Sequence, residues 1–145
     1  HLGTYVTDFP TPGLNAHPKV VALPPLGAST KEAEANCAVI VVDPLRDYLE
    51  NGTVKNAVNF PAAELLRRRG HRLSIVNRNV PNMVGQVSTC LGEHGHNIRD
   101  LLNQSKGEVG YTLVDLESEP DKKTLDEVRS IEGVLKVRRL PLPVA

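Results

Sequence analysis

Two histidines separated by one glycine are the first residues here that suggest chemistry. His94 and His96 flank Gly95, and two imidazoles at this spacing can bind a metal ion from a loop. No third ligand of suitable spacing accompanies them, so a solvated turn is the favoured interpretation. Cys37 and Cys90 lie far apart, each within an apolar helical pattern. Isolated thiols of this kind are typical of packing residues in a reducing compartment, so we expect neither a disulfide nor a metal site.

Two asparagines suggest a different chemistry. An amide side chain offers donors to a carboxylate and an acceptor to an ammonium group, which suits an amino-acid zwitterion. Asn79 lies two residues before Pro81, where an expected helix would begin with unpaired backbone amides and the positive end of its dipole. The alternative is structural: Asn79 caps that helix and Asn97 occupies a turn. The residues alone leave both interpretations open.

The elements that position these residues form a compact alternation in the second half of the chain. Their order is strand, helix, strand, strand, helix, strand, which is a ferredoxin-like βαββαβ unit. The expected elements are a strand at 72–78, a helix from Pro81 to Gly95, strands at 97–104 and 108–117, a helix marked by Leu125, Val128 and Ile131, and a strand at 134–140. Such a unit leaves one sheet face bare, so pairing with another copy is expected.

The first half contains two predicted strands, 4–9 and 19–23, then a long helix ending at Asn51-Gly52 and an extended segment at 53–61. Ser29 and Glu32 form a capping box at the start of the helix. Its apolar positions recur at helical spacing: Ala33, Cys37, Ile40, Val41, Leu45 and Tyr48. Pro44 cannot donate a backbone hydrogen bond, so a kink or break is expected there.

Composition argues against several classes of partner. The chain has 17 basic and 17 acidic residues and no Trp, so we expect no nucleic-acid binding. The basic run Arg67–Arg69, with His71 and Arg72, is interpreted as a solvated linker. No apolar stretch approaches the roughly 18 residues of a membrane span, and no signal peptide is visible, so a cytoplasmic location and no membrane contact are expected. His1 in place of Met suggests a fragment.

The second half resembles the ACT domain, a regulatory module that senses small ligands, usually amino acids. The resemblance is carried by Arg72-Leu-Ser-Ile-Val-Asn-Arg-Asn79-Val-Pro81, Gly95-His-Asn97-Ile98 and Gly110-Tyr-Thr-Leu-Val-Asp-Leu-Glu117. Leu23-Pro-Pro-Leu-Gly-Ala-Ser-Thr-Lys-Glu-Ala-Glu-Ala-Asn36 is similar to the segment that closes the active site of D-3-phosphoglycerate dehydrogenases, and Ala57-Val-Asn-Phe-Pro61 is similar to their link into the ACT domain. The motifs follow family order over essentially the whole chain.

The resemblance implies an α/β (α+β) chain. An incomplete dehydrogenase segment (1–60) and a linker (61–70) would precede a ferredoxin-like ACT domain (71–142). It implies the regulatory part of an NAD-dependent enzyme of L-serine biosynthesis that senses L-serine and forms homo-oligomers through ACT sheet edges. The alternatives are a free-standing amino-acid sensor acting on a partner and a module that only oligomerises its enzyme.

The resemblance also implies site residues. Asn77, Asn79 and Asn97 would contact the ligand, although Asn77 replaces a histidine that is frequent in the family, and Asn82 replaces a usual glycine. Asp8 and Gly27 would be remnants of the edge of the cofactor site.

The catalytic machinery is missing from this sequence. Pro25 occupies the position of the family's proton-transfer histidine and has no titratable group. The sequence contains no G-x-G-x-x-G, the loop that holds a dinucleotide pyrophosphate. The resemblance therefore implies NAD in the intact enzyme, while no cofactor and no dehydrogenase activity are expected of this chain alone.

Overall fold

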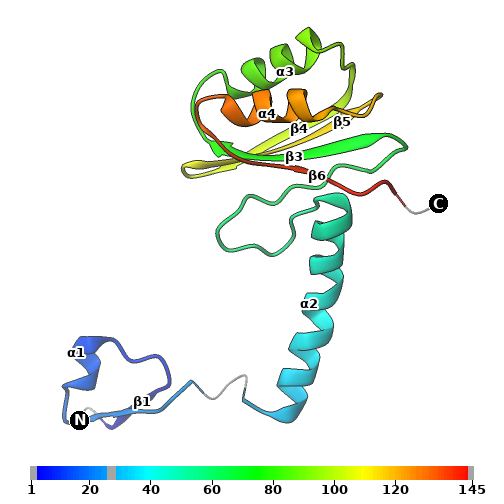
Figure 1. The fold of residues 1–145 in the computed structure, drawn as a ribbon. Coiled ribbons are helices and arrows are strands. Elements are labelled where there is room, and N and C mark those ends of the chain that lie inside the picture. Colours follow the sequence, from blue (N-terminus) through cyan, green and yellow to red (C-terminus); the bar gives the residue numbers. More distant parts are fainter. Residues whose placement is uncertain (1–2, 26–28, 144–145) are drawn as a thin grey trace. The chain divides into compact units, whose positions relative to one another are not determined.

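The computed structural model describes residues 3–25 and 29–143, and the chain divides into two compact units, His1–Val42 and Asp43–Ala145 (Figure 1). The first unit contains a small parallel sheet of β1 (Tyr5–Thr7) and β2 (Val20–Ala22), with helix α1 (Pro12–Asn15) between them in sequence. The two predicted strands are confirmed, although each is shorter than expected. Neither strand has a buried residue.

Helix α2 (Lys31–Asn51) begins one residue later than the capping box predicts. Thr30 Oγ1 accepts a hydrogen bond from the Ala33 amide at 3.1 Å, whereas Ser29 donates to the Pro25 carbonyl at 3.3 Å. The predicted break at Pro44 is wrong, because α2 continues through it. A proline costs one backbone hydrogen bond, but its fixed φ is close to helical, so intact flanking turns can carry the helix onward. The predicted end is confirmed.

Most of the predicted apolar face of α2 does not enter a core, and only Tyr48 of that face packs, partly buried, against the core on the covered side of the sheet. None of its residues is buried, and Ile40 is 67% exposed. Cys37 is exposed too, so its prediction as a buried packing residue is wrong. Although α2 is long, it is too polar to cross a membrane, as is every other helix among the described residues.

The second unit contains the predicted βαββαβ order. Its elements are β3 (His71–Arg78), α3 (Met83–Glu93), β4 (Ile98–Lys106), β5 (Val109–Leu116), α4 (Lys122–Ser130) and β6 (Val134–Arg139). The strands form an antiparallel sheet in the order β4-β5-β3-β6, which is ferredoxin-like. Helices α3 and α4 cover one face (Figure 1). Their apolar sides and alternate strand residues make the main core: Leu73, Ile75, Val87, Leu91, Val114, Leu116, Val128 and Val137.

The other face of the sheet is covered, contrary to the expectation that it is bare. Val54 and Ala63 exchange two backbone hydrogen bonds of 2.8 and 3.1 Å, which fold the segment between them into a loop. Both are buried against Tyr111 and Leu113 of β5. Tyr111 also meets the Phe60 ring edge-on, with ring centroids 6.0 Å apart. Residues 43–66 therefore belong to the packed unit, and we call them the covering segment.

A buried arginine holds this covering segment to the sheet. The Arg72 side chain on β3 is 1% exposed and lies opposite Asp115 on β5. Nε and Nη2 donate to the two oxygens of Asp115 at 2.5 and 2.6 Å. Nη1 donates to the carbonyls of Asn51 and Leu65 at 3.0 and 2.9 Å, and Nη2 also reaches Leu66 at 3.3 Å. These contacts match the five donors of a guanidinium group, so the interpretation of Arg72 as part of a solvated linker is wrong.

The C-terminal end of α2 is anchored by donors from outside the helix. The last carbonyls of a helix lack intrahelical partners and carry the negative end of its dipole. Arg138 donates to Tyr48, Arg67 to Glu50, Arg72 to Asn51 and Tyr111 to Gly52 just beyond the end. The Arg138 guanidinium also stacks 4.4 Å over the Tyr48 ring, a cation–π contact. Because Arg67 and Arg72 both donate to carbonyls at the end of α2, these two residues of the basic run have a structural role.

We predict that Arg72→Ala lowers the free energy of unfolding by about 3–5 kcal/mol, because it leaves Asp115 buried without a countercharge. Arg68→Ala is the matched control, since Arg68 is exposed in the same basic run, and it should change stability by less than about 0.5 kcal/mol. Urea unfolding measures both. Equal, small losses in the two variants would show that Arg72 does not anchor the fold.

A second prediction concerns Tyr111. Burial raises the pKa of its hydroxyl to about 12, above the ordinary value of about 10. As the pH rises, the unfolded chain therefore loses this proton at a lower pH than the folded chain does. The stability that the neutral hydroxyl contributes is complete below pH 10 and is lost between pH 10 and 12. The stability advantage of the wild type over Tyr111→Phe should shrink by about 2–3 kcal/mol across that range. Denaturant unfolding of both proteins at several alkaline pH values tests this, and a constant difference would contradict it.

Candidate ligand-binding site

Asn79 follows the end of β3 and is tied to the β4–β5 turn. Its backbone amide donates to the Glu108 carbonyl at 2.8 Å, and its side-chain Nδ2 donates to the Gly107 carbonyl at 3.0 Å. Asn79 is therefore not the cap of α3. That position belongs to Asn82, which has φ 67° and makes no side-chain capping bond. The Asn79 side chain is instead held, exposed, at one end of the sheet.

A surface groove surrounds Asn79. Its lining residues come from the end of β3, the β4–β5 turn and β6: Arg78, Asn79, Val80, Gly107, Glu108, Val109 and Leu135. Arg78 and Glu108 bring opposite charges to the groove beside the amide of Asn79. A zwitterion needs one partner of each sign, and an amide can serve either end. The sequence analysis missed these two charged residues, although both flank predicted strand ends.

Asn97 lies at the opposite end of the sheet. It is exposed, it immediately precedes β4, and its carbonyl accepts from the Glu117 amide at 3.2 Å. The pairing of β4 with β5 and of β5 with β3 puts Asn97 near the start of β3, whereas Asn79 follows its end. The eight residues of β3 span roughly 26 Å. One copy of the chain therefore does not bring the two amides together.

Asn77 is buried and already hydrogen-bonded within the sheet. Its Nδ2 donates to the Arg78 carbonyl at 2.7 Å, and its Oδ1 accepts from the Thr112 hydroxyl at 3.4 Å. The single proton of this hydroxyl is shared with Asn103 Oδ1, which lies closer, at 2.9 Å. A Cβ placed at Gly110, opposite Asn77, would lie 2.5 Å from Nδ2, so the absence of a side chain there makes room for the amide. Asn77 thus orients the strand end from which Asn79 projects.

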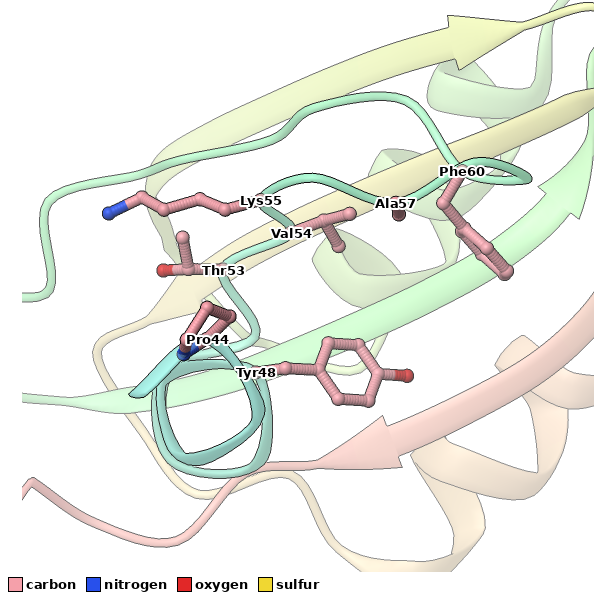
Figure 2. A pocket seen from close by; sticks show the side chains of 7 residues that line it. All are labelled: Pro44, Tyr48, Thr53, Val54, Lys55, Ala57 and Phe60. Atoms are coloured by element: carbon pink, nitrogen blue, oxygen red, sulfur yellow. The ribbon is translucent and has the colours of Figure 1, made fainter. Parts of the chain in front are cut away.

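A separate pocket lies in the covering segment and contains none of the three asparagines. Figure 2 shows its largely apolar lining, which comprises Pro44, Tyr48, Thr53, Val54, Lys55, Ala57 and Phe60. The ammonium of Lys55 is 2.9 Å from a Glu64 oxygen and 3.5 Å from an Asp47 oxygen. The hydrogen bond to Glu64 and both negative charges raise the pKa of Lys55. Lys55 is therefore paired and is a poor candidate for a catalytic base.

The residues predicted at the cofactor edge do not form a described site. Asp8 is half-buried directly after β1, and Pro25 is exposed after β2. Gly27 lies outside the described residues. Pro25 has no titratable group, so it cannot take a proton from an alcohol.

His94 and Gly95 form the turn that was expected after α3, but His94 and His96 are partly buried and not fully solvated. His94 ends α3, with its side chain 17% exposed; Nδ1 lies 2.9 Å from the Cys90 carbonyl and Nε2 lies 3.1 Å from Glu127. The two ring nitrogens of His96 lie 2.8 Å from the Ser118 hydroxyl and 3.3 Å from that of Thr124. The histidines thus have separate partners.

The chain is similar to known dehydrogenases, although no family model matches it. It is 32% identical over 153 residues to D-3-phosphoglycerate dehydrogenase of Escherichia coli K12, a match that covers 97% of this chain and 37% of the relative. The Haemophilus influenzae enzyme is 29% identical over 92% of this chain and 32% of its own length. The matched part is the carboxy-terminal region. The chain thus spans about a third of the length of these curated relatives.

Solved structures with a similar arrangement include two regulatory proteins. The ACT domain from GTP pyrophosphokinase of Chlorobium tepidum is 19% identical with a TM-score of 0.43, and the match covers 50% of this chain and all of that domain. The regulatory subunit of aspartate kinase from Thermus thermophilus is 11% identical with a TM-score of 0.43, covering 53% of this chain and 54% of that one.

Proposed function

Because this chain matches the carboxy-terminal region of D-3-phosphoglycerate dehydrogenases along 97% of its length, we propose that it is the regulatory part of such an enzyme and binds L-serine for feedback control. The observation that carries the proposal is the groove at Asn79. Arg78 and Glu108 line it with opposite charges, which suits the carboxylate and ammonium of one amino acid. The ligand is accordingly a small zwitterion.

The second half of the site comes from another copy of the chain. β4 is an edge strand, and antiparallel pairing of two β4 edges sets the start of one strand beside the end of the other. Asn97 immediately precedes β4, and the Asn79 side chain is bonded to Gly107, immediately after its end. Such pairing places Asn97 of one copy near Asn79 of the other. The ligand then lies at the seam and stabilises the dimer.

Asn77 acts indirectly in this proposal. The hydrogen bonds of its side-chain amide stay inside the sheet, where they fix the end of β3 and hence the position of Asn79. A histidine at this position, as in many ACT domains of the family, would offer a ring nitrogen in place of an amide. We therefore expect Asn77 to affect which amino acid is preferred.

The dehydrogenase chemistry itself is not assigned to this chain. NAD in the intact enzyme would need a pyrophosphate-binding loop, and no G-x-G-x-x-G is present. The residues here do not fit that cofactor on their own, and Asp8 remains only a proposed contact at its edge. The exposed apolar residues of α2, such as Val39 and Ile40, suit packing against further parts of the enzyme. A cytoplasmic location accords with the two free thiols.

The seam also supports a second candidate function, in which the sheet edges only hold two copies together and no ligand binds. It rests on the same exposed edge of β4. A free-standing sensor that acts on a separate partner would use the same groove and the same asparagines. A test of ligand binding distinguishes the module that only oligomerises from the proposed function. The length of the natural protein distinguishes the free-standing sensor from the proposed function.

We predict that L-serine raises the melting temperature of the wild-type chain by binding at this seam. At a hundredfold excess over the dissociation constant, a ligand adds about 2.7 kcal/mol of stability. Asn97→Ala should weaken binding by about 1.5–3 kcal/mol, because it removes hydrogen bonds to a charged group. Asn59→Ala is the matched control, since Asn59 is exposed on the covering segment, and it should respond to serine like the wild type.

Thermal melting with a serine titration, followed by sedimentation of the same samples, tests both parts of the site. The proposal expects serine to increase the dimer population of the wild type and of Asn59→Ala, with a much smaller increase in Asn97→Ala. Equal shifts of the melting temperature in all three proteins would show that the ligand does not bind at Asn97. A stable dimer with no response to serine would favour the module that only oligomerises.

A further inference from the structure

Three potential metal ligands meet where α3 and α4 lie on the helix-covered face of the sheet. Cys90 and His94 are four residues apart at the end of α3, so they project from the same side of the helix. Glu127 faces them from α4. One ligand atom from each residue, a thiol sulfur, an imidazole nitrogen and a carboxylate oxygen, lies within 4.8 Å of the other two. The sequence analysis weighed a metal site at His94 and His96 and favoured a solvated turn, whereas the potential ligands that converge in space are Cys90, His94 and Glu127.

The hydrogen bonds of His94 provide an independent observation. Nδ1 is 2.9 Å from the Cys90 carbonyl and Nε2 is 3.1 Å from a Glu127 carboxylate oxygen. Both neighbours are acceptors, whereas a neutral imidazole has a single N–H. If Nδ1 donates to the carbonyl, the lone pair of Nε2 faces an oxygen lone pair at contact distance. A second proton on the ring or a metal ion bound by both groups relieves this conflict, and a backbone acceptor on the second nitrogen is the usual arrangement for a metal-binding histidine.

We propose that Cys90, His94 and Glu127 bind a zinc-like divalent cation that links α3 to α4. Zinc favours this mixture of sulfur, nitrogen and oxygen ligands, with bonds of about 2.3 Å to sulfur and about 2.0–2.2 Å to nitrogen and oxygen. Two bonds of about 2.1 Å at a tetrahedral angle separate nitrogen and oxygen by about 3.4 Å, so the 3.1 Å between Nε2 and the carboxylate widens by a few tenths of an ångström when the ion binds. The sulfur needs only a side-chain adjustment. Three protein ligands leave a fourth position, which water would occupy.

The charges around the site suit a cation. Burial raises the pKa of the Cys90 thiol, and the carboxylates of Glu127 and Glu93 raise it further. The same carboxylates attract a divalent ion, which stabilises the thiolate that it coordinates. Lys123 lies 3.9 Å from the other Glu127 oxygen, so it pairs with this carboxylate without occupying the oxygen that faces His94.

Cobalt(II) tests the site, because it substitutes for zinc and its thiolate bond gives a charge-transfer absorption band. The experiment uses the whole chain, reduced and free of chelators, titrated with Co²⁺ and then with Zn²⁺ as competitor. We expect one equivalent of Co²⁺ to produce the thiolate band and Zn²⁺ to abolish it. Cys37→Ser removes the other, exposed thiol and should leave the band unchanged. Cys90→Ser should eliminate it.

Three further variants locate the remaining ligands. Glu127→Gln keeps the shape of an exposed side chain, and it should weaken Co²⁺ binding on the order of tenfold or more, as should His94→Ala. His96→Ala is the control for His94 and should bind like the wild type. Circular dichroism verifies that each variant is folded. The proposal is overturned if the wild type gives no thiolate band, if the band survives Cys90→Ser, or if Glu127→Gln and His94→Ala both bind Co²⁺ with unchanged affinity.

Discussion

The second compact unit depends on one buried guanidinium group. Arg72 is paired with Asp115 on the neighbouring strand, and its remaining donors reach three backbone carbonyls of the covering segment. A buried ion pair is stabilising only when its donors and acceptors are matched. Here the match requires Asn51 and Leu65 to lie over the sheet. The contact that neutralises the buried charge therefore also fixes the chain that precedes the sheet.

This constraint joins the four-stranded sheet to the end of α2. The helix ends in carbonyls bound by Arg138, Arg67 and Arg72, so its last turn moves with the sheet. In the proposed function, a ligand at the β4 seam changes how two sheets pair. The anchored last turn of α2 would follow such a change together with its sheet. The proposed metal site lies on the opposite face and would stiffen the α3–α4 pair independently.

The sequence contained enough information for the second half of the fold. The apolar residues of β5 and the glycine at 107, whose φ is 59°, specify a hairpin, and the apolar spacing of α4 specifies its buried side. It did not reveal the covering segment, because 53–66 has no periodic pattern and its buried residues, Thr53, Val54, Pro61 and Ala63, follow no regular spacing. Arg72 was misinterpreted because it sits beside a basic run, where charge usually indicates solvent.

The candidate site was predictable only in part. Asn79 and Asn97 were found through the resemblance, but their separation to opposite ends of one sheet follows from the strand order. Arg78 and Glu108 were missed because a charged residue at a strand end normally indicates only exposure. The convergence of Cys90 with Glu127 depends on how α3 packs against α4. The spacing of residues within either helix does not indicate this packing.

Hydrogen exchange at the Val54 and Ala63 amides tests most directly whether the covering segment is an integral part of the second compact unit. These amides donate to each other's carbonyls at 2.8 and 3.1 Å. If Arg72 holds this segment as described, both amides will be protected to nearly the same degree as those of β5, because they open only when the domain unfolds. Exchange at the rate of an open loop, with β5 still protected, would contradict the account.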